Sequence, residues 1–140
     1  MDAATISAAD DLIRISAPAD AILVIHEVIV TQDASETSEQ LPLQLQRAST
    51  DGTGSSYTAK LLEGSDAAFG GTAVHTLTVD TTPGDILWRK SENVLNGWHY
   101  LPTPETRIVI PPSGRFVIRL DAAPSAALTM TATVIFEEIG

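Results

Sequence analysis

The chain has 140 residues, 18 acidic against 8 basic side chains, a net charge of −10 at pH 7 and no cysteine. This length fits one domain over residues 1–140. The acidic balance argues against binding to nucleic acid or to an anionic membrane, because both depend on clustered lysine and arginine. Without cysteine, a disulfide framework, a thiolate nucleophile and a thiolate metal site are excluded. Stability must therefore come from packing.

The N-terminal residues 1–11 are rich in alanine and weakly patterned, which predicts an arm that orders only on a partner. They also lack the basic start and apolar run of a signal peptide, and no apolar stretch in the chain is long enough to cross a bilayer. We therefore expect a chain that folds in a cytoplasm.

A strand is predicted over residues 12–16, and a second over residues 21–32 is apolar on both faces. Strict alternation places Ile22, Val24, Val28 and Val30 on one face and Leu23, Ile25 and Ile29 on the other. One interpretation is a central strand covered on its second face by a loop. The other is that Leu23, Ile25 and Ile29 meet another subunit or a partner protein.

Two polar loops are expected at residues 33–40 and 49–57, on either side of a strand that alternates leucine with polar residues from position 41. Asp33, Glu36, Glu39 and Asp51 lie in these loops and are candidate calcium ligands, although a solvated acidic surface is the favoured interpretation. Residues 57–63 could form one helical turn, but Gly64 and the following Gly70-Gly71 leave it little room.

Strands are also predicted at residues 73–80 and 86–90, and alternation is clear over residues 115–121 and 128–137. The dipeptide Asn96-Gly97 predicts a two-residue hairpin turn between strands. About nine short strands with frequent turn signals indicate an all-β protein. We expect a single-domain antiparallel β-sandwich of jelly-roll or related Greek-key type.

The chain carries no recognised catalytic motif, and we expect no catalytic, cofactor-binding or metal-binding residues. The enzymatic alternative is a small cupin-like sandwich that holds a metal between His26, His75 and His99. Satisfied or partly exposed histidines are the more common case, so this alternative is disfavoured.

Aromatic residues cluster in one part of the chain, where Trp98 and Tyr100 share a strand face. They are interpreted as a plug in the core, with a protein interface or a stacking platform for a sugar as alternatives. The candidate protein interface predicted from the sequence consists of Leu23, Ile25, Ile29, Phe69, Trp98 and Tyr100.

Several segments resemble small structural proteins of tailed bacteriophages. They are residues 93–105 (NVLNGWHYLPTPE), 111–114 (PPSG), 67–73 (AAFGGTA) and the ending ALTM at 127–130 with FEEIG at 136–140. The resemblance spans about residues 17–140. It rests on the general character of these short segments and includes no catalytic motif.

The resemblance implies a capsid decoration (cement) protein, a non-enzymatic virion component that binds the outer capsid surface as a homotrimer and stabilises contacts between capsomers. Its partners would be the major capsid protein and further copies of itself, with no cofactor, nucleic acid or membrane. Assembly in the host cytoplasm agrees with the lack of cysteine. The alternative is a tail or baseplate component, including a receptor-binding module that grips a host glycan through Trp98 and Tyr100.

Overall fold

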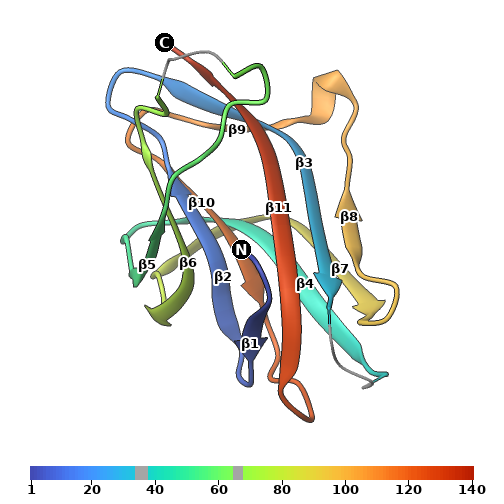
Figure 1. Cartoon of the computed structure of the whole chain (residues 1–140). Helices are drawn as coiled ribbons and strands as arrows, with labels where there is room; N and C mark the ends of the chain where they lie inside the picture. Colours follow the sequence, from blue (N-terminus) through green and yellow to red (C-terminus); the bar gives the residue numbers. More distant parts are fainter. Residues whose placement is uncertain (34–37, 65–67) are drawn as a thin grey trace.

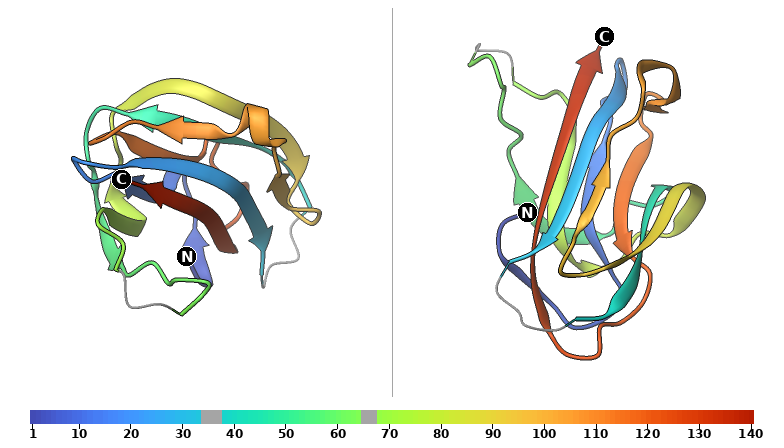
Figure 2. Two further views of the ribbon diagram at one scale, coloured as in Figure 1. Left: turned by 90° about the horizontal axis from the view of Figure 1, so that it is seen from above. Right: turned by 90° about the vertical axis from the view of Figure 1, so that its right-hand side faces the viewer.

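The structure, a computed structural model, describes residues 1–33, 38–64 and 68–140. Two antiparallel sheets pack face to face, which confirms the predicted single-domain β-sandwich (Figures 1 and 2). The strands are β1 (Ala4–Ile6), β2 (Asp10–Ser16), β3 (Ile22–Gln32), β4 (Gln40–Ala48), β5 (Thr53–Tyr57), β6 (Thr72–Val79), β7 (Pro83–Asn93), β8 (Trp98–Tyr100), β9 (Ile108–Ile110), β10 (Arg115–Leu120) and β11 (Leu128–Ile139). A short 3₁₀ helix, η1 (Pro104–Thr106), precedes β9. No helix in these described ranges is long and apolar enough to cross a membrane.

The strand order is that of a jelly roll with one added hairpin. Sheet A has the order β1-β11-β3-β8, with β9 also paired to β3, and sheet B has the order β5-β6-β2-β10-β4-β7. The chain is folded over along its length, so β1 pairs with β11, β2 with β10, β3 with β8 and β9, and β4 with β7. This nested pairing defines the jelly roll, and the β5–β6 hairpin extends sheet B beside β2.

The core lies between the inner faces of the two sheets. Leu128, Met130 and Ala132 of β11 are buried there, as their alternation predicts. Phe116 and Ile118 of β10 meet them from sheet B. Among the described residues the largest side chains that are almost wholly enclosed include Trp98, Phe116, Leu12, Leu23, Ile25, Leu43, Leu45, Ile110 and Leu120.

A bulge in β3 reverses the predicted faces of its first half. Ile25 pairs with Phe136 and Glu27 with Ile135, so His26 is an extra residue in β3 that has no counterpart in β11. Leu23 and Ile25 therefore face the core with 0% exposure, while Ile22 and Val24 face outward. The strand does have two apolar faces, but the assignment of Leu23 and Ile25 to the outer face was wrong.

The N-terminal residues are part of the sandwich in this structure and do not form the predicted arm. β1 pairs with the start of β11, and Ile6 is buried in the core. The Met1 amino group donates a 2.8 Å hydrogen bond to the carbonyl oxygen of Ala132. The N-terminal segment is thus held by pairing with β11, at the other end of the sequence. The sequence pattern of residues 1–11 alone does not reveal this contact.

Two local predictions around the middle of the chain also differ from the structure. Thr53–Tyr57 forms β5 within the predicted second loop, whereas the described residues 58–64 after it contain no helical turn. The Asn96-Gly97 dipeptide does not join a hairpin, because β7 pairs with β4 in sheet B while β8 pairs with β3 in sheet A. The turn carries the chain from one sheet to the other, and Gly97 adopts a φ of 70° there.

Candidate functional site: an open groove and an outer apolar patch

One edge of the sandwich is open because β1 is short. β1 pairs with β11 only opposite residues 128–130, and the backbone bonds between Met1 and Ala132 add one more position. Beyond Ala132, no strand of the described ranges pairs with this edge of β11. Figure 1 shows β1 ending part of the way along β11. The far half of β11 therefore forms the rim of an opening that leads toward the core.

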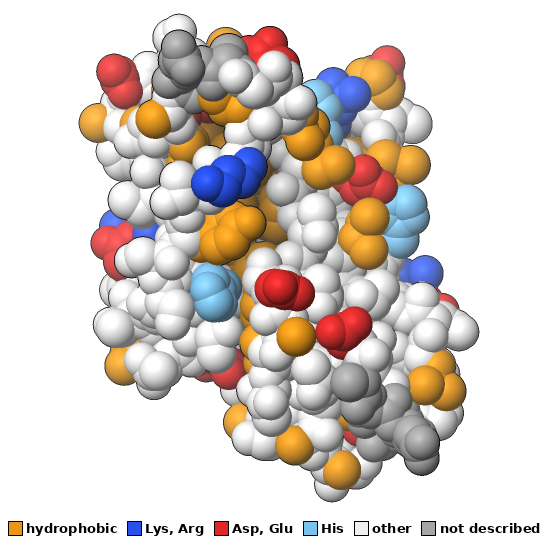
Figure 3. All heavy atoms as spheres, in the orientation of Figure 1, with side chains coloured by type: hydrophobic (Ala, Val, Ile, Leu, Met, Phe, Trp, Pro, Cys, Tyr) orange, Lys and Arg blue, Asp and Glu red, His pale blue; other side chains and the backbone are white. Residues whose placement is uncertain are grey.

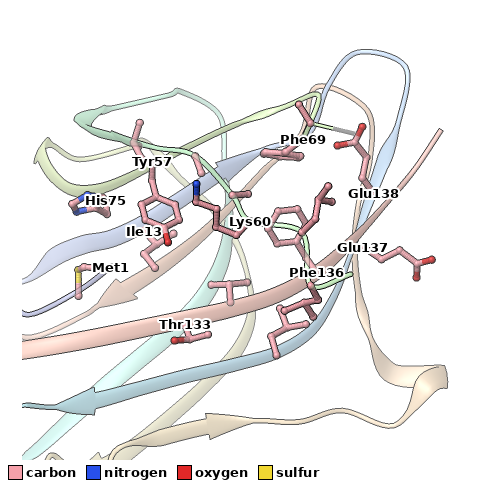
Figure 4. Close-up of a pocket in the computed structure, with 18 of the residues that line it drawn as sticks. Met1, Ile13, Tyr57, Lys60, Phe69, His75, Thr133, Phe136, Glu137 and Glu138 are labelled. Carbon is pink, nitrogen blue, oxygen red and sulfur yellow. The ribbon is translucent and has the colours of Figure 1, made fainter. Parts of the chain in front are cut away.

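This opening is a groove of about 1170 Å³ between β11 and the β5–β6 hairpin. Its floor is apolar, with Ile13 and Ala73 from sheet B and Phe136 from β11. Figure 3 shows the hollow with hydrophobic side chains in its depth, and Figure 4 shows Tyr57, Phe69 and Phe136 around it. We call this surface, lined by Ile13, Tyr57, Phe69, Ala73, His75, Val134 and Phe136, the β11 groove.

Aromatic contacts order both walls of the β11 groove. The ring centroids of Phe69 and Phe136 lie 5.0 Å apart in an edge-to-face arrangement. Tyr57 and His75 make a similar contact at 6.1 Å on the hairpin side, although Tyr57 remains 51% exposed. The Gly70 amide donates a 2.9 Å hydrogen bond to the Glu138 carboxylate, which ties the segment before β6 to the end of β11. The contacts of Phe69 and Gly70 therefore join the segment before β6 to β11 at one end of the groove.

The rim of the β11 groove is mainly acidic. Asp2 lies at the end near Met1, Asp20 and Glu138 lie at the opposite end, and Glu63 lies on the hairpin side. Lys60 is the lysine that lines the groove. Burial lowers the pKa of the Met1 amino group, and the nearby Asp2 carboxylate opposes this effect. The groove therefore favours a ligand that is apolar in the middle and cationic at its ends.

A second apolar surface lies on the outer face of sheet A. Ile22 lies opposite Ile139, Val24 opposite Val109, and Ile29 beside Thr133 in the sheet register. Val109 is 44% exposed and Ile139 is 48% exposed, while the others are half-buried. We call the set Ile22, Val24, Ile29, Val109, Ile135 and Ile139 the outer patch. It is a surface of β-branched side chains, the kind that packs well against another protein.

Two histidine–glutamate pairs flank the outer patch. His99 Nε2 lies 2.7 Å from Glu27 Oε1, and His26 Nε2 lies 3.3 Å from Glu137 Oε2. Figure 3 shows histidine and acidic side chains among hydrophobic ones toward the right, where β3 and β8 run in Figure 1. The patch is therefore an apolar area with polar, hydrogen-bonding margins, as protein interfaces commonly have.

The structure divides the predicted interface residues between three places. Ile29 lies in the outer patch and Phe69 lies in the β11 groove. Leu23, Ile25, Trp98 and Tyr100 are instead core residues, with exposures of 0%, 0%, 1% and 9%. Their prediction as a surface is wrong, as is the glycan platform on Trp98 and Tyr100, because a stacking face must be exposed. Tyr100 packs edge-to-face on Trp88 at 5.5 Å, which supports the core-plug interpretation.

The candidate metal ligands are not brought together. Among the described residues no group of three His, Asp or Glu side chains is placed to hold a metal ion. His26 and His99 lie in the pairs on sheet A, whereas His75 faces the β11 groove. Of the proposed calcium ligands, Glu36 lies outside the described residues. Asp51 binds Arg115 through two bonds of 2.7 and 3.0 Å, and Glu39 accepts from the Ser125 amide at 3.0 Å.

Sequence reasoning missed the β11 groove and the residues Ile22, Val24, Val109, Ile135 and Ile139 of the outer patch. The groove depends on where β1 stops along β11, which is a property of long-range pairing. One local signal did exist: the aromatic residues Tyr57 and Phe69 lie outside the clear alternating patterns, and such large side chains need a surface to pack on.

No family model matches the chain, and no match is found among curated proteins or among solved structures.

Proposed function

We propose that the chain is a non-enzymatic structural protein of a phage virion that decorates the outer capsid surface as a homotrimer. The observation that carries the proposal is the outer patch. β-branched side chains on a broad sheet offer apolar area for contact. They have few rotamers, so little side-chain entropy is lost when they become fixed in an interface, which lowers the entropic cost of association. The resemblance of residues 93–105 and of the C-terminal ending to phage structural proteins supplies the setting.

In this proposal the outer patch contacts either another copy of the chain or the major capsid protein. A rigid jelly roll with many long-range strand pairs suits a clamp, since its binding surface needs no folding on contact. The net charge of −10 keeps the free protein soluble and away from packaged nucleic acid.

The first experiment measures mass and capsid binding together. Sedimentation of the purified protein at micromolar concentration should give three times the 14.8 kDa mass of one chain. The protein should also co-sediment with expanded capsids assembled from the major capsid protein of the same genome. A strict monomer that does not bind these capsids contradicts the proposal. Binding to purified tails in place of capsids would favour the tail or baseplate alternative.

A matched pair of variants locates the contact. Val109→Glu places a charge in the outer patch, and Val79→Glu places the same charge on β6, at a valine that is 59% exposed. We expect Val109→Glu to weaken trimer formation or capsid binding by about ten-fold or more, because a buried unpaired carboxylate is costly. Val79→Glu should leave both unchanged. Equal behaviour of the two variants would remove the outer patch from the proposal.

A further inference from the structure

We propose that the free edge of β11 is an acceptor for an extended strand from another protein, apolar in its middle and basic at both ends. This site is distinct from the outer patch, and the inference concerns a second partner contact that the proposed function does not include. Three observations carry it. They are the direction of backbone groups that no described strand pairs with, the apolar floor beside them, and the charge of the rim.

The backbone of β11 has hydrogen-bonding groups pointing into the β11 groove. Ala132 turns its N–H and C=O toward Met1, where both are bonded. Because these groups alternate in direction along a strand, those of Val134, Phe136 and Glu138 point toward the same edge. No described strand pairs with them there. The edge over residues 133–139 is about 24 Å long at about 3.4 Å per residue, enough for one ordinary strand.

The groove floor accommodates the side chains that such a strand would turn inward. Val134 and Phe136 have their side chains on the inner face of β11, opposite Val28 and Ile25 of β3. An added strand would place alternate side chains beside them, above Ile13 and Ala73. Figure 4 shows Lys60 between Tyr57 and Phe136 and Met1 at the far end of this space, so a guest strand would have to displace the flexible Lys60 side chain. Apolar residues at every second position of the guest would complete the core at this edge.

The rim selects a guest with cationic ends. Asp2 lies at one end of the free edge, and Asp20 and Glu138 lie at the other. A second copy of the chain is a poor guest at this acidic rim, because its edge strand β7 carries acidic residues, Asp85 and Glu92, as well as basic ones. The basic pair of its edge strand β7 is already engaged, with Arg89 at 2.8 Å from Asp121 and Lys90 at 2.7 Å from Glu92. The guest is therefore a segment of a different protein.

The test uses synthetic peptides with a known alternation. Four peptides alternate threonine with valine, isoleucine, leucine or phenylalanine over seven residues and carry two lysines at each end. Four matched peptides carry glutamates in place of the lysines. We expect at least one lysine peptide to bind, with chemical-shift changes at the amides of residues 133–139. Its glutamate counterpart should bind at least about ten-fold more weakly, and added salt should weaken the lysine peptide.

Backbone methylation of the best peptide tests the pairing without changing the protein. Every described strand pair of the sandwich is antiparallel, and in an antiparallel guest the inward apolar residues direct their N–H groups at β11. N-methylation of the apolar residues should therefore reduce affinity by about ten-fold or more, since buried acceptors lose their donors. N-methylation of the threonines should leave affinity within about three-fold.

A protein variant supplies the reciprocal test. Val134→Pro removes an edge N–H without removing a bond to β3, and Val134→Ala keeps that N–H. We expect the proline variant to lose the peptide and the alanine variant to retain it. If the proline variant does not fold, the two methylated peptides decide the same point. Val109→Glu, in the outer patch, should bind the peptide like the unchanged protein, which separates this site from the proposed function.

Four results would overturn the inference. The first is that none of the eight peptides binds at about 1 mM. The second is equal binding of lysine and glutamate peptides, and the third is equal binding of the two methylated forms. The fourth is self-association of the protein that Val134→Pro abolishes and Val134→Ala preserves, since the occupant would then be a second copy of the chain.

Discussion

Arg119 Nη1 lies 2.7 Å from Asp11 Oδ1, and the Asp11 side chain is completely buried although the two residues are 108 positions apart in the chain. The other carboxylate oxygen of Asp11 accepts hydrogen bonds from the Thr81 amide at 2.7 Å and the Thr81 hydroxyl at 2.6 Å. Asp11 thus ties β2 to β10 and to the turn before β7.

Replacing Asp11 by alanine should lower the free energy of unfolding by about 3 kcal/mol, because the change leaves Thr81 and part of the Arg119 guanidinium without a partner. Urea denaturation monitored by tryptophan fluorescence measures the loss. Asp121→Ala is the control, since Asp121 pairs with Arg89, whose side chain is 53% exposed, and such pairs contribute less than about 1 kcal/mol. Equal effects of the two changes would contradict a structural role for the Asp11 carboxylate.

Asp10, beside this cluster, makes stability depend on pH. Burial, a hydrogen bond with Asp80 and the charges of Asp80 and Asp11 raise its pKa to about 6 from 3.8. Between about pH 4 and pH 6 the folded state therefore keeps a proton on Asp10 that the unfolded state has released. Between about pH 6 and pH 4 this group adds stability as the pH falls, and it destabilises the fold above pH 6.

Asp10→Asn should accordingly raise the midpoint of urea denaturation at pH 7.5 and remove most of the gain that the unchanged protein shows on going to pH 5. Asp85→Asn is the matched control, because the Asp85 side chain is 83% exposed. Asp85→Asn removes one negative charge, as Asp10→Asn does, but from a carboxylate that is not next to buried acidic groups. Titration of the Asp10 carboxyl carbon by NMR should show the same midpoint near 6. A midpoint near 4 would contradict the prediction.

Gly97 turns the chain from sheet B to sheet A, and a side chain there should destabilise the fold. Its φ is +70°, and a Cβ atom would lie 2.7 Å from the carbonyl oxygen of Val30. Gly64 has a φ of +72°, but a Cβ atom there would meet no atom of the described residues within 4 Å. Gly64→Ala should therefore cost about 1 kcal/mol and Gly97→Ala at least about 2 kcal/mol, as measured by urea denaturation. Equal losses of stability in the two variants would mean that the Val30 carbonyl of β3 leaves room for a Cβ atom at position 97.

The fold class could be predicted because its evidence is local. Leu128, Met130 and Ala132 alternate in the sequence and are buried in the structure, since each strand has one face on the core. The Asn96-Gly97 turn shows the limit of this evidence. The dipeptide indicates a sharp reversal, and the reversal exists, but whether it joins strands of one sheet or of two depends on partners far away in the sequence.

The candidate surfaces were harder to predict for the same reason. Of the residues predicted to form an interface, Phe69 lines the β11 groove and Ile29 lies in the outer patch. The β11 groove itself exists only because β1 stops early along β11. The pairing of Asp11 with Arg119 likewise joins two strands that only the jelly-roll topology brings together. Spacing in the sequence carries no information about such contacts.

The bulge at His26 yields the last prediction, because it decides which apolar residues of β3 are in the core. Leu23 is fully buried, and Val24, next to it, is half-buried on the outer face opposite Val109. Leu23→Ala should lower the free energy of unfolding by about 3 kcal/mol through the cavity that it leaves, and Val24→Ala by less than about 1.5 kcal/mol. Urea denaturation of both variants measures the difference. Strict alternation without a bulge predicts the reverse order, so a larger loss for Val24→Ala would show that β3 continues past His26 in regular register. The bulge has a further consequence for the outer patch, because removing it would return Leu23 and Ile25 to the surface and bury Ile22 and Val24 in their place.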